Sequence, residues 1–163
     1  MIKRWSTFNE SRELLNSQLE IISNKFLEVR DLFIDFEDMG IVSYTMVSPG
    51  FERSGYVSFD PKVGDVNRFL NHQLSVLIST TRIDDPKNNP FVIKRVCIIV
   101  DIKLPGEQNE FGSTVIGNEG IKLFDDMLTA NSRLIDAGYD VKMDLNSSHG
   151  QYKPVKFLIY FNL

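Results

Sequence analysis

The first forty residues carry an apolar stripe that constrains the fold more than any other feature of the chain. Its members recur at alternating spacings of four and three residues: Leu15, Leu19, Ile22, Phe26, Val29, Phe33 and Phe36. Such spacing places side chains on one side of an α-helix, and no other regular structure does this. The stripe therefore predicts a long amphipathic helix whose apolar side the rest of the chain must cover.

Local signals predict where this helix begins and ends. Thr7-Phe-Asn-Glu10 has the form of a capping box, and Gly40 follows the last periodic residue as a left-handed glycine would. We therefore expect a helix over 8–39, about 47 Å long at 1.5 Å per residue. Since this exceeds the diameter of a domain of this size, the helix either bends near Asn16-Ser17 or Ser23-Asn24, or its first turns project. A projecting end could pair with another chain, but the bulky Phe residues favour packing across a sheet.

The side of the helix opposite the stripe is acidic. Seven carboxylates fall within a sector of about 80°: Glu10, Glu13, Glu20, Glu28, Asp31, Asp35 and Asp38. Such a face ordinarily serves to keep a protein solvated. The sharper hypothesis is an acidic ridge, represented by Glu28, Asp31, Asp35 and Asp38, that binds a basic groove on a partner protein.

Beyond Gly40, strand patterns alternate with turn formers, and a second main helix follows. In chain order, the expected elements are strands at 41–48 and 56–59, a short helix at 65–72, strands at 74–82 and 91–104, a loop at 105–118, a helix at 119–137, and strands at 139–145 and 155–161. The strand at 91–104 is apolar on both faces, which is typical of a central strand. This order predicts one α+β domain over 1–163, a two-layer sandwich with the two main helices on one face of a mainly antiparallel sheet of about six strands.

The chain also contains a candidate internal repeat. Phe36-Glu-Asp-Met-Gly40 and Leu134-Ile-Asp-Ala-Gly138 each end a predicted helix, and strand, polar turn and strand follow each of them. A duplicated αββ unit would explain this, whereas Asp-x-Gly stops also arise by coincidence.

Composition narrows the class of protein. The chain has 18 Lys and Arg against 22 Asp and Glu, which gives a net charge of −4. A negative net charge disfavours general nucleic-acid binding, because the phosphate backbone is also negative. Cys97 is the single cysteine, so an intramolecular disulfide is excluded and a reducing compartment is favoured. No segment reaches the length of a membrane span and the start of the sequence lacks an apolar signal region. We therefore expect a soluble cytoplasmic protein.

Strong catalytic signatures are absent from the sequence, but one weak motif has the right context. A strand that ends in Asp101-Ile-Lys103, preceded by Asp84 or Asp85, resembles the PD-(D/E)xK pattern of metal-dependent nucleases. Carboxylates in such a site hold Mg²⁺ while the lysine helps to orient a water molecule. However, Asp-x-Lys occurs four times in this chain, and Asp-Asp-Pro stands where Pro-Asp is expected. A Mg²⁺-dependent nuclease is therefore an alternative, and the main interpretation requires no cofactor or metal.

The opening of the chain suggests an origin. Ile2-Lys-Arg-Trp-Ser-Thr-Phe-Asn-Glu-Ser11, which runs into a long helix with an acidic Asp-x-Gly stop, resembles the start of many small uncharacterised proteins of large contractile-tailed bacteriophages. The resemblance covers about a quarter of the chain and implies synthesis in a bacterial cytoplasm, with no site residues. We expect a non-enzymatic protein-binding or accessory protein of phage type. A virion component that self-associates through its first helix is a further alternative.

Overall fold

The computed structural model describes residues 2–49, 58–84, 93–108, 110–111, 114–145 and 154–163. These segments form α1 (Ile2–Asp31), α2 (Ile34–Asp38), β1 (Val42–Val47), α3 (Val66–Asp84), β2 (Arg95–Lys103), β3 (Gly106–Gln108), β4 (Thr114–Ile116), α4 (Asn118–Asp136), β5 (Asp140–Asp144) and β6 (Pro154–Asn162). The α+β class is therefore confirmed. The described part of the chain has four helices where two main helices and a short one at 65–72 were expected.

Among the described residues, the main sheet has four antiparallel strands in the order β1-β2-β6-β5. The prediction of about six strands exceeds this number, because the segment expected as a strand at 74–82 is helical. Of the strand expected at 56–59, residues 56–57 lie outside the described residues, and Phe59 joins β1 through a single bridge to Tyr44. The predicted loop at 105–118 contains β3 and β4, which pair with each other in a separate two-stranded sheet. The central position of β2 is confirmed, since it pairs with β1 on one side and with β6 on the other.

α3 replaces the predicted short helix and strand with one continuous helix. Leu74, Val76, Ile78 and Thr80 alternate as in a strand, but the buried side chains of this segment follow a helical period: Phe69, Leu70, Gln73, Leu77 and Thr80. The carboxylate of Asp65 caps the helix by accepting a hydrogen bond of 2.9 Å from the backbone N–H of Arg68. A short apolar run fits both periods, and packing against α1 and β1 selects the helix.

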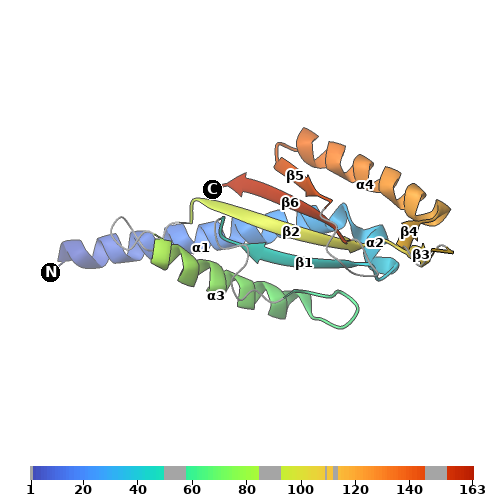
Figure 1. Cartoon of the computed structure of the whole chain (residues 1–163). Helices are drawn as coiled ribbons and strands as arrows, with labels where there is room; N and C mark the ends of the chain where they lie inside the picture. The colour runs from blue at the N-terminus through green and yellow to red at the C-terminus, as the bar shows by residue number, and fades with distance from the viewer. Residues whose placement is uncertain (1, 50–57, 85–92, 109, 112–113, 146–153) are drawn as a thin grey trace.

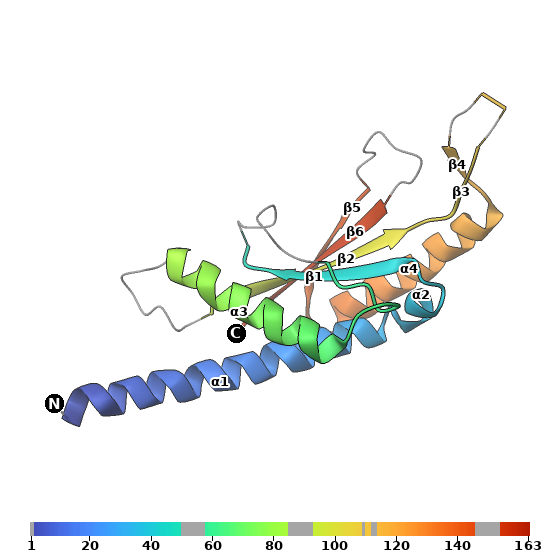
Figure 2. The same cartoon turned by 90° about the horizontal axis from the view of Figure 1, so that it is seen from below.

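α1 differs from its prediction at both ends. It begins at Ile2, so Thr7–Glu10 lies inside the helix instead of capping it, and it ends at Asp31 rather than continuing to residue 39. The break falls at Leu32–Phe33, away from the two bends proposed from the sequence. Figure 2 shows the first turns of α1 projecting beyond the sheet, which is one of the two alternatives that the predicted length left open.

A partly buried ion pair spans the break between α1 and α2. Arg30 donates from Nε to Glu37 Oε1 at 2.6 Å and from Nη2 to Glu37 Oε2 at 2.7 Å. Glu37 is buried, and the hydroxyl group of buried Tyr44 lies near its carboxylate. Burial, and then this carboxylate, raise the pKa of Tyr44. The bidentate geometry fixes how α2 folds back against α1.

Two glycines end their helices in the same way. Gly40 and Gly138 have φ of +66° and +88°, and each donates its N–H to the carbonyl three residues earlier, at 2.8 and 2.9 Å. The next residues, Ile41 and Tyr139, donate to the carbonyls of Phe36 and Leu134, which completes a Schellman motif after α2 and after α4. Each glycine therefore follows the end of a helix as predicted, although the helix before Gly40 is the short α2 and not the long helix that was expected to reach residue 39. Within the described residues, β5 pairs with β6 over five residues, whereas β1 is joined to the segment expected as its partner strand by one bridge, between Tyr44 and Phe59.

The helices lie on one side of the main sheet. α1 crosses behind it, α3 follows the β1 margin and α4 follows the β5 margin (Figures 1 and 2). The apolar stripe identified in the sequence, here called the α1 stripe, supplies four fully buried side chains to the core: Ile22, Phe26 and Val29 on α1, and Phe33 in the break that follows it. The opposite face of the sheet carries a smaller apolar cluster: Val47, Cys97 and Ile99, with Leu158 and Tyr160 packed against them.

We predict that Phe33→Ala lowers the free energy of unfolding by about 3 to 5 kcal/mol, because it leaves a cavity among buried rings. Phe33 is fully buried, with its ring centroid 5.9 Å from Phe36 and 5.2 Å from Phe157. Urea unfolding followed by circular dichroism measures the change. Phe111→Ala is the matched control, since Phe111 is 86% exposed and its truncation should change stability by less than about 0.5 kcal/mol. A Phe33→Ala midpoint equal to that of the wild type would contradict the prediction.

Candidate functional site

The residues of the nuclease hypothesis are divided between two ends of the sheet. Asp101 and Lys103 share the face of β2 that is turned away from the main core. Asp84 is the last residue of α3, whose end lies near the start of β2 (Figure 2), and Asp85 lies outside the described residues. Asp101 follows Arg95, the first residue of β2, by about 20 Å of extended strand. The structure therefore does not bring Asp84 to Asp101. The described residues hold no group of three or more His, Cys, Asp and Glu side chains that could bind a metal ion.

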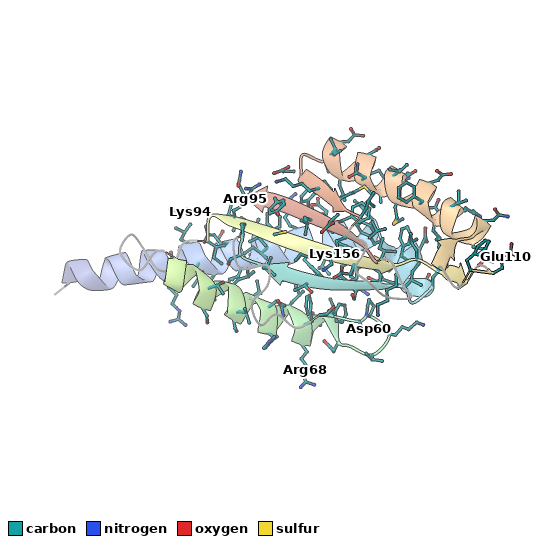
Figure 3. All side chains as sticks on the ribbon, viewed as in Figure 1. Asp60, Arg68, Lys94, Arg95, Glu110 and Lys156 are labelled. Atoms are coloured by element: carbon teal, nitrogen blue, oxygen red, sulfur yellow. The ribbon has the colours of Figure 1, made fainter. Side chains whose placement is uncertain are left out.

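Asp101 is nevertheless an unusual surface carboxylate. Its side chain is 23% exposed, and its Oδ1 lies 3.6 Å from Nζ of Lys156 on β6. Burial raises the pKa of Asp101, while Lys156 and then Lys103 oppose that shift. Figure 3 shows Lys156 toward the opposite end of the sheet from Arg95. The arrangement can hold a proton or a basic group, but it lacks the second carboxylate of a magnesium site.

The acidic ridge is exposed, yet it does not form one continuous helical face. Glu28 and Asp31 belong to α1, whereas Asp35 and Asp38 belong to α2 beyond the break. Glu28 also has structural contacts, because it accepts the hydroxyl of Tyr139 at 2.6 Å and pairs with Lys25 at 2.8 Å. Lys25, and next Tyr139, lower the pKa of Glu28. A role for the ridge in partner binding remains a prediction.

A cleft of about 330 Å³ lies beside Glu28, where α4 meets β5. It is lined by Lys25, Arg95, Ala137, Gly138, Tyr139, Asp140, Tyr160, Phe161 and Asn162. Two cations flank it, each above an aromatic ring: Lys25 Nζ lies 5.1 Å from the ring centre of Tyr139, and the Arg95 guanidinium lies 4.6 Å from that of Tyr160.

Both cations of the cleft are also matched by carboxylates. Lys25 pairs with Glu28, and Arg95 pairs with Asp140 at 2.7 Å. The cleft is therefore charge-balanced, and its cation–ring contacts fix the ends of β2, β5 and β6. The sequence offered no signal for it, because its lining comes from segments far apart along the chain.

α4 exposes more apolar surface than the core needs. Its buried side is complete, with Leu123, Met127, Ala130 and Leu134. A second row, here called the α4 stripe, recurs every seven residues: Ile121, Leu128 and Ile135, which are 57, 43 and 54% exposed. All three lie in the helix that the sequence predicted at 119–137, but the sequence alone could not separate its core-facing apolar residues from those facing solvent. Leu14 and Ile21 on α1 are exposed at the same spacing.

No protein-family model, curated protein or solved structure matches this chain. None of the helices within the described segments combines the length and the apolar character needed to cross a bilayer. A function for the chain therefore has to follow from its own surface chemistry.

We predict that Tyr139→Phe raises the pKa of Glu28, because it removes a hydrogen bond that stabilises the carboxylate. Folding lowers the pKa of Glu28 below its ordinary value of 4.5, so the charged carboxylate stabilises the folded state. This stabilisation is present above pH 4.5 and is lost as the pH falls through the pKa of Glu28 in the folded protein. Titration of the Glu28 side-chain carboxyl carbon by NMR measures the shift. Tyr160→Phe is the control and should leave this titration unchanged. An unaltered Glu28 pKa in Tyr139→Phe would contradict the hydrogen bond.

We predict that Asp101→Asn raises stability at neutral pH. Folding raises the pKa of Asp101 above its ordinary value of 3.8, so the charged carboxylate destabilises the folded state. This destabilisation begins as the pH rises through 3.8 and is complete above the pKa of Asp101 in the folded protein. Urea midpoints of the wild type and variant at pH 7 and at pH 3 test this, and the difference should shrink at the lower pH. Exposed Asp126→Asn should change stability by less than about 0.5 kcal/mol. A destabilised Asp101→Asn at pH 7 would show that the ion pair with Lys156 outweighs burial.

Proposed function

We propose that this chain is a non-enzymatic protein-binding protein that binds its partner through the α4 stripe. The supporting observation is the exposure of Ile121, Leu128 and Ile135 at heptad spacing on a helix whose opposite side is already buried. A helix that needs one apolar side for its own core usually presents polar residues elsewhere. A second apolar row at a constant spacing is typical of a helix that packs against a further helix or strand.

The resemblance of residues 2–11 to phage proteins supplies the proposed setting, an accessory factor that contacts a host or virion protein in a bacterial cytoplasm. The acidic ridge is a second proposed contact, suited to a basic partner surface. Self-association through the first helix has some support, because α1 exposes Leu14 and Ile21. The nuclease alternative would need another carboxylate beside Asp101, and no described metal-binding group supplies one.

We predict that Leu128→Ser abolishes partner binding while leaving the fold intact, because Leu128 is partly exposed and lies at the centre of the α4 stripe. Tagged wild type and variant are compared by affinity capture from bacterial lysate with quantitative mass spectrometry. The control is Thr129→Ala, a truncation at the next, exposed position, which should retain the wild-type set of proteins. Circular dichroism and thermal unfolding establish that each variant is folded. Identical captured proteins for Leu128→Ser and wild type would count against the α4 stripe as a binding surface.

A further inference from the structure

We infer that the partner bound on the α4 side of the molecule is a second copy of this chain, joined through β5. The inference rests on the proposed function, since it specifies what covers the α4 stripe. β5 is the last strand of the main sheet and pairs with β6 alone among the described strands. An edge strand presents backbone groups that another strand can pair with. Figure 1 shows α4 and β5 at the same margin of the molecule.

The residues of β5 alternate between two chemistries. Val141 and Met143 pack against the main core. Lys142 lies over the ring of Tyr160 on the opposite face, and Asp140 and Asp144 share that face by alternation. Leu145, which directly follows β5, is 57% exposed. An added strand therefore needs apolar residues on one face and reversed charges on the other, which is a pattern that β5 itself can supply.

Charge pairing selects among the registers of an antiparallel β5–β5 pair related by a two-fold axis. Residues directly opposite each other lie on the same face of the sheet. A pair centred on Lys142 sets this lysine against its own copy and Asp140 against Asp144, so every charge meets a like charge. A pair centred on Met143 instead sets Lys142 of each copy against Asp144 of the other. Two opposite-charge pairs then form across the axis.

The Met143-centred register also covers exposed apolar surface. It places Val141 of one copy opposite Leu145 of the other, on the core side of the sheet. A register centred on Val141 also matches Asp140 with Lys142, but it leaves Leu145 uncovered and places Met143 opposite Tyr139, whose hydroxyl is already bonded to Glu28. The Met143-centred pair is therefore the one that the charges and the exposed side chains favour together.

The α4 stripe supplies apolar contact area that the pairing of two short strands does not provide. A lone pair of strands is marginal in water. A two-fold axis perpendicular to the joined sheet puts both α4 helices on the same side of it, running antiparallel. The stripe is symmetric about Leu128, so antiparallel packing sets Ile121 of one copy toward Ile135 of the other. Strand and helix thus contribute to one self-complementary surface.

Charge reversal on the full-length chain tests this pairing. Sedimentation equilibrium over a wide concentration range should show a monomer–dimer equilibrium for the wild type. Lys142→Asp and Asp144→Lys should each weaken dimerisation by about ten-fold or more, because each turns two attractive pairs into repulsive ones. The double variant carrying both changes should dimerise like the wild type. An equimolar mixture of the two single variants should form heterodimers, since all of their cross-strand pairs are again opposite in charge.

Arg68→Asp is the matched control, an equivalent charge reversal on α3 away from the β5 margin (Figure 3), and it should leave dimerisation unchanged. Circular dichroism establishes that each variant is folded. A monomeric wild type at every concentration overturns the inference, and so does a dimer that is insensitive to both reversals. Single variants that dissociate without rescue by the double change or by mixing overturn the Met143-centred register. A third result separates this inference from the proposed function. If the wild type is monomeric but captures a different protein, and Leu128→Ser no longer captures that protein, then the α4 stripe binds a partner that is not a second copy of this chain.

Discussion

The packing of the α1 stripe against the sheet is the interaction on which the other elements depend. Phe26 brings its ring within 5.6 Å of Tyr44 on β1 and 5.3 Å of Phe69 on α3, while Phe33 reaches Phe157 on β6. The stripe, which continues from α1 into the break after it, therefore contacts both halves of the main sheet and the helix that borders it. Because these rings are buried, displacement of α1 would expose a large part of the core at once.

The sequence predicted correctly the elements whose hydrophobic patterns are long. Its predictions failed where the pattern is short, or where tertiary contacts determine the secondary structure. The α1 stripe and the apolar run of β2 extend over enough residues to exclude the alternative period. α3 was misread because Leu74, Val76 and Ile78 alternate by coincidence over a short run. The break after Asp31 depends on Arg30 and Glu37, whose pairing follows from the fold of the whole region. For the candidate site, the helix predicted at 119–137 contains Ile121, Leu128 and Ile135, but the exposure of these side chains depends on where α4 meets the sheet.

The two faces of the sheet have different chemistry, and this limits where function can be located. The face toward α1 is apolar and filled. The other face carries a small apolar cluster around Cys97, with Asp101 and Lys156 toward one end and Arg95 and Asp140 at the other. Each of these charges has a neighbour of opposite sign, so the face does not attract ions of one sign strongly. Exposed apolar side chains lie instead on the helices, in rows on α4 and on α1, which makes a macromolecular partner a better match than a small charged ligand.

The contact between Gln18 and Ile93 has a consequence for the projecting part of α1. The Gln18 carboxamide donates to the carbonyl oxygen of Ile93 at 2.9 Å and accepts from its N–H at 3.0 Å, so a side chain takes the place of a neighbouring strand. An apolar stripe of constant spacing would tolerate a slide of the helix by two turns, since one large side chain could replace another. The paired amide does not tolerate it, because both hydrogen bonds would be lost in a buried setting. The seventeen residues from Ile2 to Gln18 therefore form an arm of fixed reach, about 24 Å from its first residue to its last at a rise of 1.5 Å per residue, and whatever it contacts is held at a set distance from the sheet.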